Sequence, residues 1–154
     1  MPLWQWLLDA VLALLALVVL YGLGLVLRRR ALARHGGTFE LGFRARTSRP
    51  GRGWLLGIGR YSGDDLEWFR VFSLSPRPKT VWHRDRLVFA GRRDPEGAEQ
   101  VSLYADHVVV RCTTTDAPEG VVELAMSPSS LMGFQSWLEA GPPGANWDSR
   151  RPRR

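Results

Sequence analysis

The sequence LWQWLLDAVLALLALVVLYGLGLVL, from Leu3 to Leu27, is an almost unbroken apolar run that ends directly before Arg28, Arg29 and Arg30. A helix rises about 1.5 Å per residue, so this run is about 37 Å long and can cross a hydrocarbon core of about 30 Å with some tilt. Residues 1–30 are therefore predicted to form a transmembrane helix with a basic inner flank.

The basic residues around the run predict its orientation. Arg28, Arg29, Arg30 and Arg34 follow it, whereas no basic side chain precedes it. By the positive-inside rule, the N-terminus lies outside the cell membrane and the rest of this single-pass chain lies in the cytoplasm. A cleaved signal peptide would need a basic start, a shorter apolar stretch and a small-residue cleavage site, so the pattern favours a retained span.

Asp9 is the one ionisable residue within the apolar run. A charge at membrane depth is costly, which would favour a partner helix or an ion path. Asp9 also lies only about 9 Å from the start of the run, close enough to reach headgroups or water, and this interpretation is favoured. The sequence leaves the choice open.

The net charge of +6 does not belong to the part of the chain that is predicted to fold in the cytoplasm. Residues 38–148 hold thirteen basic and fourteen acidic residues. The excess lies in the juxtamembrane arginines and in a C-terminal tail with Arg150, Arg151, Arg153 and Arg154. Nucleic-acid binding would require a basic domain, so no nucleic-acid partner is expected, and the tail is either solvated or in contact with anionic lipids.

The charges within the domain are divided unevenly along the chain. Residues 38–93 carry twelve basic and five acidic residues, and residues 94–148 carry one basic and nine acidic residues. This pattern favours ion pairing between the two halves, and the alternative is one positive and one negative face. Cys112 is the single cysteine, so neither an internal disulfide nor a cysteine-rich metal site is expected.

Residues 31–37 read as a juxtamembrane linker, residues 38–140 as a β-rich cytoplasmic domain, and residues 141–154 as a disordered tail rich in Pro, Gly and Arg. Alternating apolar residues and turn signals predict short strands. These are residues 38–46, 54–61, 66–74, 80–83, 86–91, 100–104, 106–113 and 121–126. Ser127 as N-cap, Pro128 and the helical spacing of Leu131, Phe134 and Leu138 then predict an amphipathic helix over 128–140.

The predicted fold class is mainly β: a transmembrane helix followed by a small antiparallel β-barrel or sandwich that one C-terminal helix closes. This order of elements resembles the fold of pleckstrin-homology domains. Fold alone does not set function.

The sequence contains no complete catalytic or metal-binding motif. His83-Arg84-Asp85 begins like a kinase catalytic loop, but Ala90 stands where that loop needs Asn. Gly57-Ile58-Gly59 is not followed by the third glycine of a dinucleotide site. We therefore expect a protein that is not an enzyme and that uses no cofactor or metal ion.

Basic residues of the early strands are the candidate contacts with a headgroup or a partner, because arginine forks match phosphate and carboxylate groups. The basic candidates are Arg77, Lys79, Arg84, Arg86, Arg92 and Arg93, and Trp82, which lies among them in the sequence, is a further candidate. Trp82 could lie exposed among them or pack in the core. Arg70 is in phase with apolar neighbours and is expected to be semi-buried and paired.

Several short motifs resemble an actinobacterial family of small single-span membrane proteins, catalogued as domain of unknown function 2550. They are the basic-flanked span, Gly53-Trp54, Gly57, Arg60-Tyr61, Trp68-Phe69-Arg70, Ser73-Leu74-Ser75, Arg92-Arg93 and Phe134-Gln135-Ser136-Trp137-Leu138-Glu139. The resemblance implies an uncharacterised protein of the cell membrane and supplies no activity.

Two functions are compatible with these features. The first is a membrane-tethered, non-enzymatic interaction module that docks a protein partner at the inner leaflet. The alternative is a sensor of anionic lipid headgroups that uses a basic face of the β domain. The sequence identifies neither the partner nor the lipid, and it leaves the oligomeric state and the sharing of one face by the basic residues open.

Overall fold

The computed structural model describes residues 3–34, 37–45, 49 and 51–141. The chain divides into two compact units. The helix unit comprises residues 1–35 together with residues 72–76, and the β unit comprises residues 36–71 and 77–154. The predicted tail arginines at positions 150, 151, 153 and 154 lie outside the described residues.

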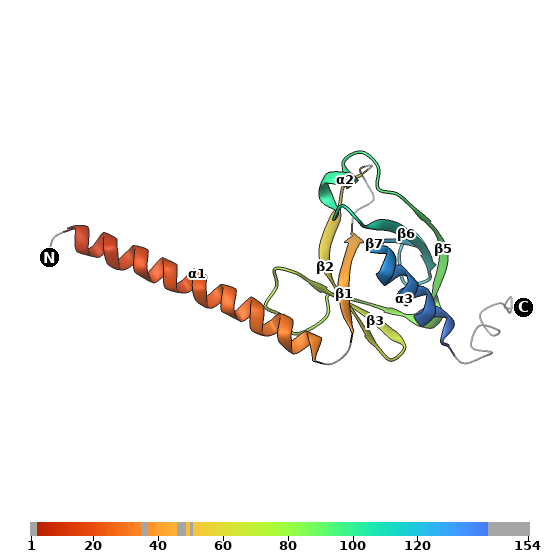
Figure 1. The fold of residues 1–154 in the computed structure, drawn as a ribbon, viewed down its shortest axis with the longest axis horizontal. Helices are drawn as coiled ribbons and strands as arrows, with labels where there is room; N and C mark the ends of the chain where they lie inside the picture. The colour runs from red at the N-terminus through yellow and green to blue at the C-terminus, as the bar shows by residue number, and fades with distance from the viewer. Residues whose placement is uncertain (1–2, 35–36, 46–48, 50, 142–154) are drawn as a thin grey trace, which may run out of the picture. The chain divides into compact units, whose positions relative to one another are not determined.

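The helix unit is built on one long helix, α1 (Leu3–Ala33), which is the first element in Figure 1. Among the described residues, α1 alone is long and apolar enough to cross a membrane, and its apolar side chains are largely exposed. Its length and composition are those of a membrane span or of an N-terminal signal sequence. The helix continues beyond residue 30 into the segment that was predicted to be a linker.

The β unit contains one seven-stranded sheet in which every neighbouring pair is antiparallel. The strands are β1 (Thr38–Arg44), β2 (Trp54–Ser62), β3 (Asp65–Arg70), β4 (Thr80–His83), β5 (Leu87–Arg93), β6 (Val108–Thr114) and β7 (Val121–Met126). Their order across the sheet is β4-β3-β2-β1-β7-β6-β5.

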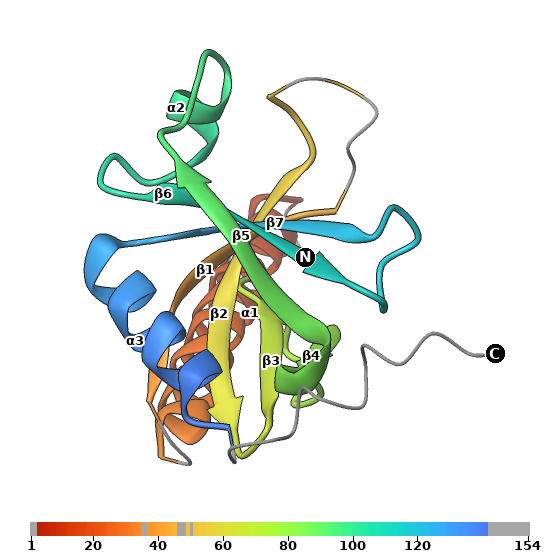
Figure 2. The same cartoon turned by 90° about the vertical axis from the view of Figure 1, so that its right-hand side faces the viewer.

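The sequence predicted an antiparallel barrel or sandwich; the antiparallel sheet is confirmed, but it is not closed into a barrel. β4 and β5 are its two edges and do not pair with each other. A single short 3-10 turn, η1 (Arg84–Arg86), connects them along the chain, and Figure 2 views the unit from the side of β5. The two edge strands are neighbours in sequence, but no hydrogen-bonded ladder joins them, so the sheet is open.

The hairpin between β2 and β3 was predicted from its turn residues and is confirmed. Gly63 adopts a left-handed backbone, with φ of 62°, which glycine tolerates without steric cost. Across the hairpin, Arg60 lies opposite Glu67, and their side chains form an ion pair of 2.6 Å. Cross-strand pairs of opposite charge support the register of such a hairpin.

The core lies between the sheet and the C-terminal helix α3 (Pro128–Glu139), which the sequence predicted correctly. The Ser127 side chain caps α3 by accepting a hydrogen bond of 3.2 Å from the Ser130 backbone N–H. Phe134 of α3 and Trp68 of β3 are fully buried in one cluster. The Trp68 indole N–H is satisfied there by a hydrogen bond of 2.8 Å to the Leu41 carbonyl, as a buried polar group requires.

One predicted strand is wrong. Residues 100–104 were expected to be extended, but the structure places the short helix α2 (Glu99–Ser102) at the start of this segment. Leu103 ends the helix, and its N–H donates to the Glu99 carbonyl at 2.9 Å. The apolar residues that suggested a strand are Val101, which is exposed, and Leu103, which is buried. Four residues are too few for periodicity to separate a helical turn from a strand.

The predicted end of β3 is also wrong. The strand was expected to continue to Leu74, with Arg70 semi-buried, but β3 ends at Arg70 and the Arg70 side chain is exposed. Phe72 and Leu74 are 77% and 50% exposed, although their alternation with Trp68 had indicated burial. The chain leaves the β unit here because residues 72–76 belong to the helix unit.

Two glycine-to-alanine substitutions should have opposite effects on stability. A Cβ at Gly57 would overlap the Trp68 indole and the Phe69 carbonyl, so Gly57→Ala should destabilise the β unit by about 3 kcal/mol. A Cβ at Gly133 in α3 meets no atom within 4 Å, so Gly133→Ala should stabilise it by about 0.5–1 kcal/mol. Thermal unfolding of the full chain in detergent, followed by near-UV circular dichroism, measures both. Equal effects would contradict this packing.

Candidate functional site

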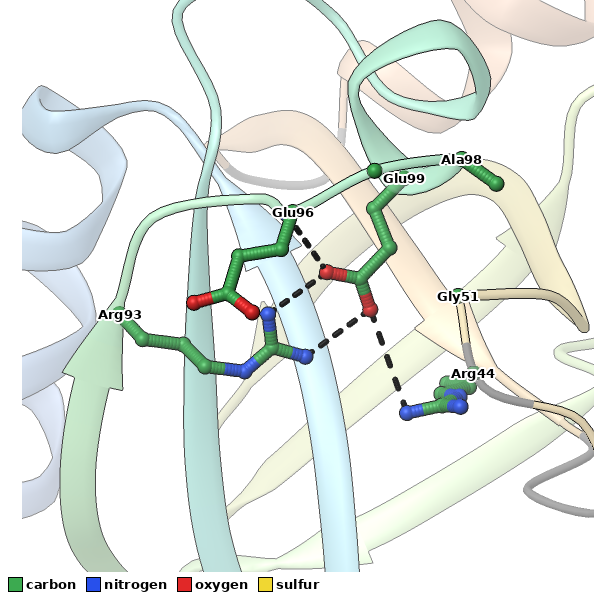
Figure 3. A pocket seen from close by; sticks show the side chains of 7 residues that line it. Arg44, Gly51, Arg93, Glu96, Ala98 and Glu99 are labelled. Atoms are coloured by element: carbon green, nitrogen blue, oxygen red, sulfur yellow. Dashed lines mark hydrogen bonds and ion pairs between the residues drawn. The ribbon is translucent and has the colours of Figure 1, made fainter.

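An open hollow of about 570 Å³ lies where α2 faces the ends of β1 and β5. It is lined by Arg44, Gly51, Arg93, Glu96, Gly97, Ala98 and Glu99 (Figure 3). The side chains that reach into it are mainly arginine and glutamate, so ionic groups define the site.

Glu99 is the centre of this hollow, and its side chain is almost fully buried. Arg93, at the end of β5, binds it in a bidentate manner: Nη1 donates to Oε2 at 2.6 Å and Nη2 donates to Oε1 at 2.9 Å. The Glu96 backbone N–H also donates to Oε2 at 3.1 Å, and the Trp54 indole N–H donates to Oε1 at 3.2 Å. Four donors thus satisfy one buried carboxylate.

Glu123 of β7 is a second carboxylate with little exposure, and it extends the network across the sheet. Arg44 Nη1 lies 2.5 Å from Glu123 Oε2, and Arg93 Nη2 lies 3.6 Å from Glu123 Oε1. Arg111 stands directly opposite Glu123 in the β6–β7 register, with Nη2 also 3.6 Å from Oε1. Arg44 further approaches Glu99 at 4.0 Å.

Arg44 also holds the connection between β1 and β2. Its Nε donates to the Arg52 carbonyl at 3.2 Å, and its Nη2 donates to the Arg49 carbonyl at 3.1 Å. The guanidinium is therefore fixed by two carbonyls of the loop and by the Glu123 carboxylate. Such a planar fork with several donors is the use for which arginine is better suited than lysine.

Glu99 and Arg93 form a fixed ion pair. The hydrogen bond from Arg93 is the main reason that the pKa of Glu99 falls from 4.5 to about 2. The same bond raises the pKa of Arg93 above its ordinary value. Both groups therefore stay ionised near neutral pH, which suits a fixed ion-pair network and is unsuited to general acid–base chemistry.

Ion pairing between the basic first half and the acidic second half of the domain is confirmed. Arg44 and Arg93 of the first half bind Glu123 and Glu99 of the second half. Arg86 of the first half likewise pairs with Asp116 of the second half, with Nη1 2.9 Å from Oδ1. Three of the twelve basic residues of the first half thus pair with carboxylates of the second half.

The predicted candidate Trp82 lies in the core. Its side chain is only 3% exposed and makes an edge contact with Phe43, with ring centroids 5.1 Å apart. The alternative of an exposed, stacking tryptophan on a basic face is therefore wrong. Trp82 is in β4 opposite Leu66, and burial of Leu66 places both side chains on the core face.

The predicted basic candidates fall on three separate segments. Arg77 and Lys79 precede β4 and are exposed. Arg84 and Arg86 belong to η1: Arg84 pairs with Asp64 and donates to the Trp137 carbonyl at 3.2 Å, and Arg86 pairs with Asp116.

Arg92 and Arg93 end β5, where Arg92 is exposed and Arg93 binds Glu99. Three of the candidates, Arg84, Arg86 and Arg93, are thus engaged with carboxylates.

The sequence reasoning did not single out Arg44, Glu99 or Glu123 as a site. Glu123 carried a usable signal, because it interrupts the otherwise apolar strand Val121–Met126, and a buried charge needs a partner. Glu99 carried none, since its burial depends on α2 and on Arg93, which a local pattern does not reveal. Arg93 was among the sequence candidates, but Arg44 was hidden among the twelve basic residues of the first half.

Two further titratable side chains are buried away from the hollow. His107 packs against Tyr104 with ring centroids 4.9 Å apart and ring planes tilted by 57°, its Nδ1 has no hydrogen-bond partner, and burial lowers its pKa. Cys112 is buried in the core, where desolvation raises its pKa to about 12. Within the described ranges, no group of three or more His, Cys, Asp or Glu side chains is placed to hold a metal ion.

A family model described as "Protein of unknown function (DUF2550)" matches residues 15–144. The chain belongs to the DUF2550 family. It is 34% identical over 112 residues to the uncharacterized protein ML1147 of Mycobacterium leprae, covering 71% of this chain and 74% of that protein. It is 31% identical over 133 residues to the uncharacterized protein Rv1312 of Mycobacterium tuberculosis, covering 84% and 89% respectively. The earlier resemblance is confirmed at the level of the family.

Acid should weaken the β unit partly through Glu99. Because its pKa is about 2 in the folded chain and 4.5 ordinarily, its stabilising contribution is complete above pH 4.5 and is lost as the pH falls toward 2. Glu99→Gln should lower stability at pH 7 by about 3 kcal/mol, since Arg93 loses a buried partner. It should also flatten the acid side of the stability profile.

Denaturant unfolding of the detergent-solubilised chain between pH 3 and pH 7 measures this effect. Glu96→Gln is the matched control, because Glu96 lies in the same loop with an exposed side chain. An unchanged acid profile in Glu99→Gln would show that Glu99 does not carry this dependence.

Cys112 should be inert toward thiol reagents in the folded protein. Its side chain is fully buried and its thiolate is strongly disfavoured, so maleimide should not react at neutral pH before the β unit unfolds. Mass spectrometry of the full chain, with and without denaturant, measures the adduct. Rapid labelling of the native chain would contradict the burial of Cys112.

Proposed function

We propose that this protein is a membrane-anchored, non-enzymatic interaction module that docks a protein partner at the inner leaflet of the cell membrane. The observation that carries the proposal is the outer edge of β5. This strand has seven residues and pairs with β6 on one side, and the described residues place no strand on its other side. An unpaired strand of this length can accept an extended segment of a partner.

The side chains of β5 suit such an addition. Val88 is 61% exposed and Ala90 is exposed, so the outer face of the strand offers apolar contact beside main-chain donors and acceptors. Arg92, exposed at the end of the strand, favours an acidic residue in the partner. The opposite edge strand, β4, has only four residues and offers a shorter ladder.

The anchor in this proposal is α1, which spans the membrane with its N-terminus outside. The arginines at positions 28, 29, 30 and 34 support this orientation, because all follow the apolar run. A tether keeps the β unit at the membrane surface, where effective concentration makes a weak partner contact sufficient.

We further propose that the β unit is a pleckstrin-homology-like domain. Seven antiparallel strands followed by one C-terminal helix support this relation. Such a relation would concern the fold alone, and the proposed function rests on the edge of β5.

The alternative, a sensor of anionic lipid headgroups, has less support. Arg84, Arg86 and Arg93 are already bound to carboxylates, so a phosphate would have to displace a partner from each. Arg77, Lys79 and Arg92 are exposed, but they lie on two different segments of the chain. A phosphate-binding cluster needs several such side chains to converge.

A photo-crosslinking residue at Val88 tests the proposal in the native membrane. We expect a covalent adduct with one protein from position 88 and none from position 101, since Val101 is 91% exposed on α2 and outside the sheet. The adduct is identified by mass spectrometry and that protein is purified. Adducts with lipid alone, or equal protein adducts from both positions, would refute partner docking at β5.

Val88→Lys should then weaken binding of the purified partner about 10-fold or more, because it places a charge in the apolar contact. Val101→Lys is the control and should bind as the unsubstituted chain does. Both side chains are exposed, so neither substitution should change thermal unfolding appreciably. Unchanged affinity in Val88→Lys would exclude this edge as the docking surface.

A further inference from the structure

The segment Phe72–Pro76 connects β3 to β4 but belongs to the helix unit. Tyr21 Oη of α1 donates a hydrogen bond of 3.2 Å to the Phe72 carbonyl, and Arg28 Nε donates one of 2.8 Å to the Ser75 carbonyl. Figure 1 shows this loop beside the C-terminal part of α1. The loop is therefore fastened to the helix at two points along its length.

The helix residues that hold the loop lie on one face. Tyr21, Gly24 and Arg28 are spaced by three and four residues, which places them one above the other on an α-helix. A Cβ at Gly24 would lie 3.4 Å from Leu74 Cδ2, so the absence of a side chain at Gly24 lets Leu74 approach the helix backbone. Along this face, the Tyr21 donor, the space at Gly24 and the Arg28 donor thus follow one another.

The loop exposes two large apolar side chains next to an apolar helix. Phe72 is 77% exposed and Leu74 is 50% exposed, because neither side chain packs in the β core. One turn before the residues that hold the loop, and on the same face of α1, Leu17 and Leu20 are 65% and 67% exposed. Loop and helix thus both expose large apolar side chains on this side of the helix unit, and exposed apolar surface marks contact with a membrane or a protein.

We propose that Phe72–Pro76 is a membrane-inserted loop that buries Phe72 and Leu74 among the acyl chains of the inner leaflet. This inference rests on the proposed span of α1. If Arg28, Arg29 and Arg30 mark the inner headgroup level, Tyr21 lies seven residues, or about 10 Å, deeper in the bilayer. The hydrogen bond to Tyr21 therefore holds Phe72 at the depth of the acyl chains.

The hydrogen bonds of the loop fit that environment. Non-helical backbone at membrane depth is tolerated only where its polar groups are satisfied by the protein. The helix side chains satisfy the carbonyls of Phe72 and Ser75, and the Ser75 N–H donates to Ser73 Oγ at 3.2 Å. Pro76 has no backbone N–H to satisfy. A loop in water would not need its carbonyls paired with a transmembrane helix.

Insertion of this loop gives the β unit a second attachment to the bilayer. The first is the chain that follows α1, and the second is the loop, which lies one residue after β3 and three residues before β4. Two attachments restrict the rotation of a tethered domain far more than one does. The inserted loop would thereby limit how the β unit presents its partner edge.

Site-specific fluorescence in nanodiscs tests the insertion. The full chain carries Phe72→Cys, Leu74→Cys or Val101→Cys, labelled with a polarity-sensitive maleimide dye, while buried Cys112 stays unlabelled in the parent chain. We expect dyes at 72 and 74 to emit at shorter wavelength, to be quenched by lipids with a nitroxide near the top of the acyl chain, and to resist aqueous iodide. The dye at 101 should show the reverse.

Quenching of the dyes at 72 and 74 by iodide, as at 101, would overturn the proposal. Quenching of all three dyes by nitroxide lipids would also overturn it, because the β unit as a whole would then lie on lipid. Alkaline extraction of membranes separates a failure of the span: a chain released by carbonate has no transmembrane α1. A chain that resists extraction but has aqueous dyes at 72 and 74 refutes only the inserted loop.

Tyr21→Phe supplies a second readout that leaves the apolar helix intact. It removes the donor to the Phe72 carbonyl, so the dye at 72 should become more accessible to iodide and lose nitroxide quenching. Tyr104→Phe is the control, because Tyr104 is in the β unit and outside the loop. Equal quenching of the dye at 72 in the Tyr21→Phe and parent chains would show that Tyr21 does not position the loop.

Discussion

The ion pair between Arg44 and Glu123 crosses the narrowest junction of the sheet. β1 and β7 share two register pairs, whereas β1 and β2 share seven and β6 and β7 share six. This short seam joins the half formed by β4, β3, β2 and β1 to the half formed by β7, β6 and β5. Continuing the seam by one residue sets Arg44 opposite Glu123, so an electrostatic contact replaces the missing ladder. The pair joins the two halves beside the apolar core that both halves build.

The same pair explains why the charges are separated along the chain. The first half of the sheet comes from the basic part of the domain, and Glu123 and Glu99 come from the acidic part. Glu123 thus pairs with Arg44 from a strand 79 residues away in sequence, whereas Glu99 pairs with Arg93 only six residues before it. Buried charges that lose one partner are strongly destabilising, so this arrangement penalises incorrect pairing of the halves. Its role is architectural, which agrees with a site whose groups remain ionised near neutral pH.

Local patterns in the sequence were sufficient for α1, the β2–β3 hairpin and the capped helix α3, because each depends on neighbours in the chain. They were insufficient for α2, whose Glu99 is stabilised by Arg93 and Trp54. They also failed at Phe72, where alternation indicated the core but contacts with α1 determine the position. The open sheet has the same cause, since pairing of β4 with β5 depends on curvature that no local pattern encodes.

Tyr21 and Gly24 are the residues of the apolar run that a simple span does not require. A helix that only crossed the bilayer would be served as well by leucine at both positions. With the loop in place, each has a physical use: the Tyr21 hydroxyl satisfies a carbonyl, and Gly24 leaves room for Leu74. If the apolar helix served only as a removable signal, these contacts would be lost and the apolar loop would be left without its support. The loop contacts therefore support retention of α1 as the membrane anchor in our proposal.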